Sequence, residues 1–322
     1  MTLARQLAVI AVAAWATAGT GFGQAIQVDA AIPGYQTTSG VSGNLNSIGS
    51  DTLNNLMTLW AEGFQRQYPN VRIQIEGKGS STAPPALIAG TAQLGPMSRE
   101  MRSTEIDEFE KVFGYGPTLF KVAIDALAVY VNRDNPLERL SIRQVDGIFS
   151  KGRACGGGGI DTWGEAGLTG DWASRPVSLY GRNSASGTYG YFKENALCKG
   201  DYRDTVKEQP GSASVVQGVT EDLYGVGYSG IGYRTSGVKP VALSGSDGSY
   251  YTTEPADVYS GHYPLARFLY VYVNQAPNQP MDPLVREFLT YVLSHDGQET
   301  VVKDGYLPLT GQLQQEEFAK LR

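Results

Sequence analysis

The chain has 322 residues, a formal net charge of −6, 41% hydrophobic residues, 40 glycines, two cysteines and two histidines. This length is enough for two domains with their own cores, and an acidic chain without a basic patch argues against nucleic-acid binding. The cysteines and histidines match no metal-ligand spacing, so neither a metal nor another cofactor is expected.

The first 25 residues have the pattern of a secretory signal peptide. Arg5 precedes an uncharged apolar run at 7–18, and the small residues Gly23 and Ala25 follow it. An N-terminal membrane anchor is the alternative, but the run is too short to cross a bilayer core of ~30 Å. We therefore predict cleavage after Ala25 and export to the periplasm or the extracellular space.

The two cysteines are expected to be bonded to each other. An even cysteine count in an exported protein favours a disulfide, here between Cys155 and Cys198. Closing a loop of this length contributes ~4 kcal/mol in the chain-entropy model. Two free thiols are the alternative.

Strands and helices are expected to alternate along the chain, which predicts an α/β architecture. Helix 49–68 has the clearest pattern, because Leu56, Trp60 and Phe64 fall on one apolar face. The other helices are expected from 84, from 103 to 112, and at 141–149, 189–197, 215–223 and 283–294. Strands are expected at 71–75, 92–95, 119–131, 177–180 and 266–273, and the run 231–233 is expected to be β-like.

Residues 225–230 fit a G-x-G-x-x-G pattern. A dinucleotide site needs a strand before this pattern and a helix after it. Here a helical stretch precedes it and a β-like run follows. We therefore interpret the glycines as a turn or the entry to a strand.

Three segments share the order strand, glycine- and hydroxyl-rich turn, helix: 49–52, 79–82 and 182–188. A helix N-terminus presents unpaired N–H groups, and Ser or Thr hydroxyls add donors, so such turns can bind an anion. A single turn of this kind is usually only a capped helix. Arg182 favours anion binding over a simple helix cap for the third turn, because a guanidinium donates two parallel hydrogen bonds to an oxyanion. For Arg182 and for Arg99, which follows a predicted strand, a surface ion pair is the alternative.

Four motifs in order resemble those of the PstS-type periplasmic phosphate-binding proteins. Residues 47–53 (SIGSDTL) resemble their first phosphate loop, and 77–81 (GKGSS) resemble the second. Residues 94–100 (LGPMSRE) resemble the segment after it, and 182–188 (RNSASGT) match the Arg-x-x-x-Ser-Gly-Thr signature. The resemblance runs from about residue 44 to the C-terminus.

This resemblance implies a type II periplasmic-binding-protein fold, with two α/β lobes and a two-segment hinge that closes over phosphate. Residues 26–122 and 265–322 would form lobe I, and 123–264 lobe II, with crossings near 120–124 and 262–266. It also implies a monomeric, non-catalytic protein that delivers inorganic phosphate to the inner-membrane permease of an ABC importer.

The expected phosphate-binding residues lie in the four motifs. They are Ser50, Asp51, Thr52, Ser80, Ser98, Arg99, Arg182, Ser186, Gly187 and Thr188. Two of them depart from better-known members, since Asp51 stands where a Thr is often found and Arg99 where those members have an Asp.

The apparent exchange of a carboxylate and a hydrogen-bond donor between positions 51 and 99 suggests a role for Asp51. Phosphate carries a proton at neutral pH and sulfate does not, whereas an ionised carboxylate can only accept hydrogen bonds. Asp51 would therefore accept a P–OH and repel a fully deprotonated oxyanion. In this hypothesis Arg99 offsets the charge of Asp51.

The alternatives are an enzyme, an adhesive or scaffold protein, and a binding protein for a different oxyanion. A metal-dependent phosphatase needs clustered Asp and His ligands, and a serine hydrolase needs a G-x-S-x-G elbow; the sequence contains neither. An adhesive or scaffold protein could reuse the fold. Sulfate, molybdate or tungstate could replace phosphate, although the resemblance favours phosphate.

Overall fold

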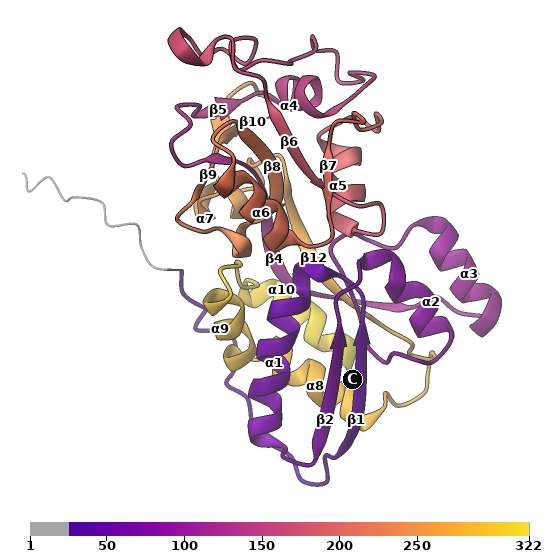
Figure 1. Ribbon diagram of the computed structural model, residues 1–322. Helices are drawn as coiled ribbons and strands as arrows, with labels where there is room; N and C mark the ends of the chain where they lie inside the picture. Colours follow the sequence, from indigo (N-terminus) through magenta and orange to yellow (C-terminus); the bar gives the residue numbers. More distant parts are fainter. Residues whose placement is uncertain (1–25, 246, 322) are drawn as a thin grey trace, which may run out of the picture.

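The computed structural model describes residues 26–245 and 247–321 and has two lobes, stacked one above the other in Figure 1. The lower one, lobe I, contains both ends of the described chain, and the upper one, lobe II, contains its middle. The predicted signal peptide, residues 1–25, lies outside the described residues. Within the described part, no helix is both long and apolar enough to cross a membrane.

Lobe I packs helices around β1, β2 and the ends of two long strands (Figure 1). Its strands are β1 (Gly43–Ile48), β2 (Val71–Glu76), β3 (Gly95–Met97), most of β12 (Ala266–Val273) and the first half of β4 (Thr118–Asn132). Its helices are α1 (Asn54–Gln67), α2 (Ala83–Ile88), α3 (Ser103–Phe113), α8 (Pro283–Leu293), α9 (His295–Lys303) and α10 (Gly311–Phe318), with 3-10 turns η1 (Asp51–Leu53), η2 (Ser80–Thr82) and η5 (Ala319–Leu321).

Lobe II is built on the second half of β4. Its strands are β5 (Arg139–Leu140), β6 (Ser178–Arg182), β7 (Lys207–Gln209), β8 (Gly225–Gly230), β9 (Val238–Pro240), β10 (Ala242–Ser244) and β11 (Tyr250–Tyr251). Its helices are α4 (Ile142–Phe149), α5 (Gly187–Asn195), α6 (Ser212–Glu221) and α7 (Pro255–Tyr259), with 3-10 turns η3 (Gly170–Trp172) and η4 (Ile231–Tyr233).

One seven-stranded sheet runs through both lobes, in the order β3-β12-β4-β8-β6-β7, with β9 also paired to β4. Residues 118–126 of β4 pair antiparallel with β12, and residues 127–131 pair antiparallel with β8. β4 therefore passes from one lobe to the other without a break. The predicted lobe boundaries, 122/123 and 264/265, fall within β4 and just before β12, and they stay a prediction.

The strongest sequence patterns give the expected elements. Trp60 and Phe64 of α1 are fully buried, and the Trp60 Nε1–H donates to the carbonyl of Gly297 at 2.8 Å. From residue 122 to residue 132 every residue of β4 is buried, which explains its near-continuous apolar run. The predicted α/β class is confirmed.

One predicted strand is displaced, and one predicted element is wrong. Residues 92 and 93 lie outside any strand, Leu94 forms only an isolated bridge to Ser47, and β3 runs from Gly95 to Met97. The run 231–233 is the 3-10 turn η4 and not β-like, because the Arg234 amide donates to the Ile231 carbonyl and closes a turn.

The glycine-rich pattern at 225–230 is itself the strand β8. A Cβ added at Gly227 would lie 2.8 Å from Val215 Cγ1 and 2.9 Å from Val219 Cγ2 of α6. This glycine therefore allows a helix to pack closely on the strand, and the segment has none of the geometry of a dinucleotide loop.

The predicted disulfide is confirmed. Cys155 and Cys198 are bonded, and they connect the loop after α4 to the segment after α5. α5 thus begins near the other lobe and ends at a covalent crosslink within lobe II.

Candidate functional site

The turns that follow β1 and β2 lie at one edge of lobe I. The two strands are parallel, so their carboxyl ends meet there. The Gly49 amide donates to the carbonyl of Glu76, and the Gly79 amide donates to the carbonyl of Gly49. The Ser50 amide donates to the carbonyl of Pro96 at 2.7 Å, which brings β3 to the same edge.

Four buried hydroxyl groups form a cluster where the lobes meet. Thr52 Oγ1 lies 2.9 Å from Thr188 Oγ1, which lies 3.4 Å from Ser98 Oγ. Ser98 Oγ lies 3.3 Å from Ser80 Oγ, which accepts from the Ser98 amide at 3.0 Å. No side chain of the four is more than 1% exposed. Since Thr188 belongs to lobe II, hydroxyls from both lobes converge at one point.

The N-terminus of α5 is in direct contact with this cluster. Ser186 caps the helix by accepting from the Tyr189 amide at 3.3 Å. A Cβ on Gly187 would lie only 2.2 Å from Ser80 Oγ, so only glycine allows this approach. The Ser81 amide of lobe I also donates to the carbonyl of Ala185 in lobe II at 3.1 Å.

Arg182, the last residue of β6, is 2% exposed. Its Nη1 lies 3.1 Å from Asp51 Oδ2 and donates to Ser212 Oγ at 2.7 Å, and its Nη2 donates to the carbonyl of Pro210. Its Nε is buried without a hydrogen-bond partner among the described residues. Burial lowers the pKa of the Arg182 guanidinium, and the charge of Asp51 opposes that shift.

The expectation that Arg99 offsets the charge of Asp51 is wrong. The Arg99 guanidinium binds both carboxylate oxygens of Glu105, each at 2.7 Å. Glu105 lies in the first turn of α3, only six residues after Arg99, and its carboxylate neutralises the Arg99 guanidinium. Asp51 is instead paired with Arg182, and its Oδ2 also accepts from the Ser212 amide at 2.7 Å.

The pKa of Glu105 reflects its pairing with Arg99. Burial alone would raise it, but hydrogen bonds from Arg99 and from the Arg102 amide outweigh burial, and the pKa lies below its ordinary value. Glu105 therefore stays ionised at neutral pH. The pair stands beside the hydroxyl cluster, and Arg99 Nη2 donates at 3.2 Å to Ser81 Oγ, the residue next to Ser80 of the cluster.

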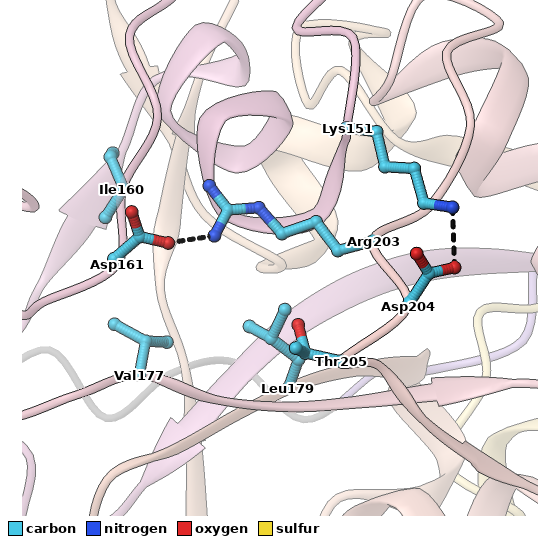
Figure 2. A pocket seen from close by; sticks show the side chains of 8 residues that line it. All are labelled: Lys151, Ile160, Asp161, Val177, Leu179, Arg203, Asp204 and Thr205. Atoms are coloured by element: carbon cyan, nitrogen blue, oxygen red, sulfur yellow. Dashed lines mark hydrogen bonds and ion pairs between the residues drawn. The ribbon is translucent and has the colours of Figure 1, made fainter.

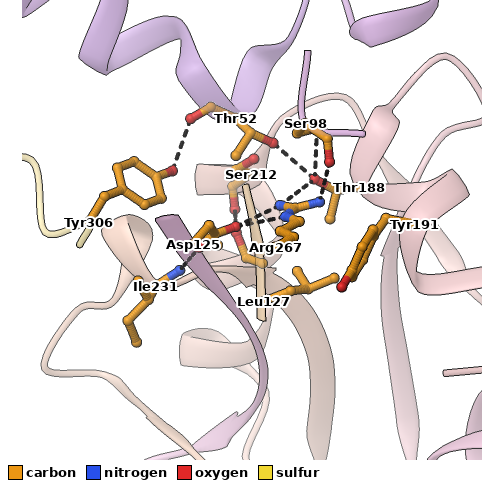
Figure 3. Close-up of polar contacts among 12 residues, drawn as sticks. Thr52, Ser98, Asp125, Leu127, Thr188, Tyr191, Ser212, Ile231, Arg267 and Tyr306 are labelled. Carbon is orange, nitrogen blue, oxygen red and sulfur yellow. Dashed lines mark hydrogen bonds and ion pairs between the residues drawn. The ribbon is translucent and has the colours of Figure 1, made fainter. Parts of the chain in front are cut away.

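Sequence reasoning missed a buried ion pair behind the cluster, between Arg267 of β12 and Asp125 of β4 (Figure 3). The two residues face each other across the antiparallel strands, and both side chains are at most 1% exposed. A signal was present: each is a charged residue inside an otherwise apolar strand run, and such residues are rarely buried unless paired.

Each of the three arginines around the cluster is paired with a carboxylate: Arg182 with Asp51, Arg99 with Glu105, and Arg267 with Asp125. The paired charges sum to zero. An anion at this point would therefore be held by oriented N–H and O–H donors rather than by an excess of positive charge.

Two other cavities lack this convergence of donors. One of about 380 Å³ lies at the opposite end of β6 from Arg182, where Arg203 pairs with Asp161 and Lys151 with Asp204 (Figure 2). A groove of about 730 Å³ runs between the segment 99–103 and α5. Several of its cations are already paired, such as Lys193 with Asp201.

Comparisons with known proteins agree with this geometry. The sequence model of the PBP superfamily domain matches residues 34–296. The chain is 57% identical to the phosphate-binding protein PstS of Pseudomonas aeruginosa, over the whole chain and 99% of that protein. It is 28% identical to PstS of Staphylococcus haemolyticus, over 80% of this chain and 79% of the relative.

The fold is also similar to that of solved structures. An ABC-type phosphate transport receptor from Vibrio cholerae superposes with a TM-score of 0.64 at 22% identity, over 82% of this chain and all of that one. At this identity the likeness concerns the fold, and it confirms the predicted two-lobed binding-protein architecture.

Proposed function

The chain belongs to the PstS family of phosphate-binding proteins, and we propose on that basis that it binds inorganic phosphate between its lobes and delivers it to an ABC-type importer. The observation that carries this proposal is the meeting of four buried hydroxyls, the α5 N-terminus and Arg182 where the lobes touch. The role is binding and release, with no chemical step.

We propose that the ligand contacts come from the four motifs. The hydroxyls of Ser50, Thr52, Ser80, Ser98, Ser186 and Thr188, the amides at Gly187 and Thr188, the Arg99 and Arg182 guanidinium groups and the Asp51 carboxylate would surround the anion. The buried Nε groups of Arg182 and Arg99, without partners among the described residues, support roles as donors. Exposure of 2% or less for most of these side chains supports a site shielded from water, where such bonds are strongest.

Asp51 is proposed to recognise the proton of phosphate. In the described part of the chain, both partners of its carboxylate, Ser212 and Arg182, contact Oδ2. This arrangement leaves Oδ1 to accept a P–OH. Because a carboxylate has no proton to donate, sulfate would meet it with unrelieved repulsion.

Export and transport partners complete the proposal. We propose that the first 25 residues direct the chain to the periplasm and are removed after Ala25, and that the mature monomer meets an inner-membrane permease. Hinge crossings near 120–124 and 262–266 would let the lobes separate for release. The N-terminal residue of protein recovered from the periplasm tests the cleavage: any mature chain that begins elsewhere than Ile26 contradicts it.

Calorimetric titration of ligand-stripped protein with phosphate, arsenate and sulfate tests the binding function. We expect phosphate and arsenate to bind and sulfate to bind at least about tenfold more weakly, a difference of ~1.4 kcal/mol. Asp51→Asn should reduce this discrimination, whereas Asp161→Asn, in an ion pair far from the cluster, should not. Equal binding of sulfate, or full discrimination by Asp51→Asn, would contradict the assignment.

A further inference from the structure

The Arg267–Asp125 pair lies where the two long strands pass between the lobes. Arg267 and Asp125 are direct cross-strand partners in the register of β12 and β4. Asp125 Oδ2 accepts from Arg267 Nε at 2.9 Å and from Nη2 at 2.7 Å. Asp125 Oδ1 accepts from the Ile231 amide of lobe II at 2.9 Å. The carboxylate thus fixes the guanidinium at the waist of the molecule.

The remaining donors of Arg267 reach one residue of each lobe (Figure 3). Nη1 donates to the carbonyl of Ser98 in lobe I at 2.9 Å. Nη2 donates to Thr188 Oγ1 in lobe II at 3.0 Å. Both residues contribute a hydroxyl group to the cluster, so one guanidinium joins the two halves of the proposed site from behind.

The bond to Thr188 also determines the direction of its hydroxyl proton. A guanidinium can only donate, so Thr188 Oγ1 is the acceptor in that bond and its own proton must point elsewhere. The neighbours it can face are Thr52 Oγ1 at 2.9 Å and Ser98 Oγ at 3.4 Å, on the inner side of the cluster. Arg267 therefore presents Thr188 to the interior of the cluster as a hydrogen-bond donor.

We propose that Arg267 is a positioning residue that couples lobe closure to ligand retention. It holds Thr188 and Ser98 together when the lobes are closed, and the bond to Thr188 is lost when lobe II moves away. The inference rests on the proposed phosphate binding. A ligand that binds the closed state more tightly than the open state shifts the equilibrium between them towards closure. The bond from Arg267 to Thr188 stabilises the closed state and therefore adds to the retention of that ligand.

The kinetics of phosphate binding to Arg267→Lys test the proposal. Lysine keeps the charge opposite Asp125, but one ammonium group cannot also hold both Ser98 and Thr188 in the geometry of a guanidinium. We expect the dissociation rate of phosphate to rise about tenfold to a hundredfold, as for one lost hydrogen bond to a charged group, with little change in the association rate. Small-angle scattering should also show less compaction on addition of phosphate.

A matched control separates this role from a structural one. Arg203 also pairs with a carboxylate, that of Asp161 (Figure 2). It donates as well to the carbonyl of Gly147, and like Asp161 it lies beyond the end of β6 opposite Arg182. Arg203→Lys should lower the melting temperature and leave the phosphate dissociation rate unchanged. A second variant, Arg267→Gln with Asp125→Asn, removes both buried charges and should also release phosphate faster.

The outcomes distinguish this inference from the proposed function. If the unaltered protein binds no phosphate, the proposed function fails. If it binds phosphate and Arg267→Lys or the double variant releases it at the unaltered rate, Arg267 is only a structural residue and the inference is overturned. A rise in the dissociation rate that Arg203→Lys reproduces would also overturn it.

Discussion

Gly187 offers the sharpest test of how the lobes meet. It is the first residue of α5, and its backbone lies outside the left-handed region, so alanine fits its conformation. A Cβ there would lie 2.2 Å from Ser80 Oγ, 2.7 Å from Ser98 Oγ and 2.8 Å from Ser80 Cβ, all below the 3.0 Å that real contacts respect. The obstructing atoms belong to the opposite lobe. Gly187→Ala should therefore leave each lobe folded and prevent the lobes from closing.

The expected loss follows from the size of the overlap. The Ser80 Oγ contact falls 0.8 Å short of the permitted distance, and rotating the Ser80 hydroxyl does not relieve the contact with its Cβ. Holding the lobes apart by this amount would lengthen at least one hydrogen bond from lobe I to the anion, at ~1.5–3 kcal/mol each. Phosphate affinity should therefore fall about tenfold to a hundredfold. The melting temperature without ligand should not fall, because alanine is favoured over glycine in a helix.

Calorimetry and thermal melting of Gly187→Ala and Gly190→Ala provide the assay. Gly190 lies in the same helix, and a Cβ there would make an ordinary 3.4 Å contact with Arg99 Cδ. The Gly190 variant should bind phosphate as the unaltered protein does. If Gly187→Ala binds phosphate with unchanged affinity, the anion is not held between Ser80 and the α5 N-terminus, and the reasoning is refuted.

Three further predictions concern charge and crosslinking. Burial raises the pKa of Asp304 from 3.8 to about 6, so above that pH the folded state carries an ionised, half-buried carboxylate. Asp304→Asn should therefore raise the unfolding free energy by about 1 kcal/mol at pH 7.5, after allowance for partial exposure, and this gain should shrink as the pH falls towards 4. Replacing both Cys155 and Cys198 by Ser should lower the unfolding free energy by up to ~4 kcal/mol in chemical denaturation while phosphate affinity stays the same, because the disulfide lies beyond the far end of α5. Phosphate affinity should change less than about threefold between low and physiological salt, because the arginines at the site are each neutralised; a steep decrease would indicate long-range attraction instead.

The long elements could be predicted because their patterns are periodic over many residues. β12 has the expected limits, and α1 ends within one residue of the expected limit but begins five residues later, after the 3-10 turn η1. The short strands β5, β9, β10 and β11 contain two or three residues each, too few to show a period of two, and their pairing to other strands determines their conformation. The prediction for residues 231–233 was wrong for a similar reason, because a distant residue determines their conformation. The amide of Ile231 donates to the carboxylate of Asp125, which is 106 positions away in the sequence.

The sequence predicted the individual turns of the candidate site, because each turn carries its own glycine and hydroxyl residues. It did not predict the contacts between residues of different lobes. Glycine and hydroxyl residues before a helix indicated the turns at 49–52, 79–82 and 182–188 correctly. The partner of Asp51 could not be read in the same way, because Arg182 lies in the other lobe. Arg99 was assigned to Asp51 because the two departures from the resembled motifs looked like an exchange of a carboxylate and a donor, whereas the structure pairs Arg99 with Glu105 in the first turn of α3.

The pairing of every arginine at the site gives the proposed selectivity a physical basis. An unpaired buried guanidinium would attract the more highly charged anion most strongly, and sulfate always carries two charges at neutral pH while phosphate carries one or two. With Arg182 neutralised by Asp51, that preference disappears, and the anions differ mainly in whether they can donate a proton to Asp51. Asp51→Asn would therefore change two things at once: it would replace one acceptor oxygen by an NH2 donor, which can serve sulfate, and it would leave Arg182 with an uncompensated charge. Sulfate should gain from both, and its binding should become more dependent on salt than that of phosphate to the unaltered protein.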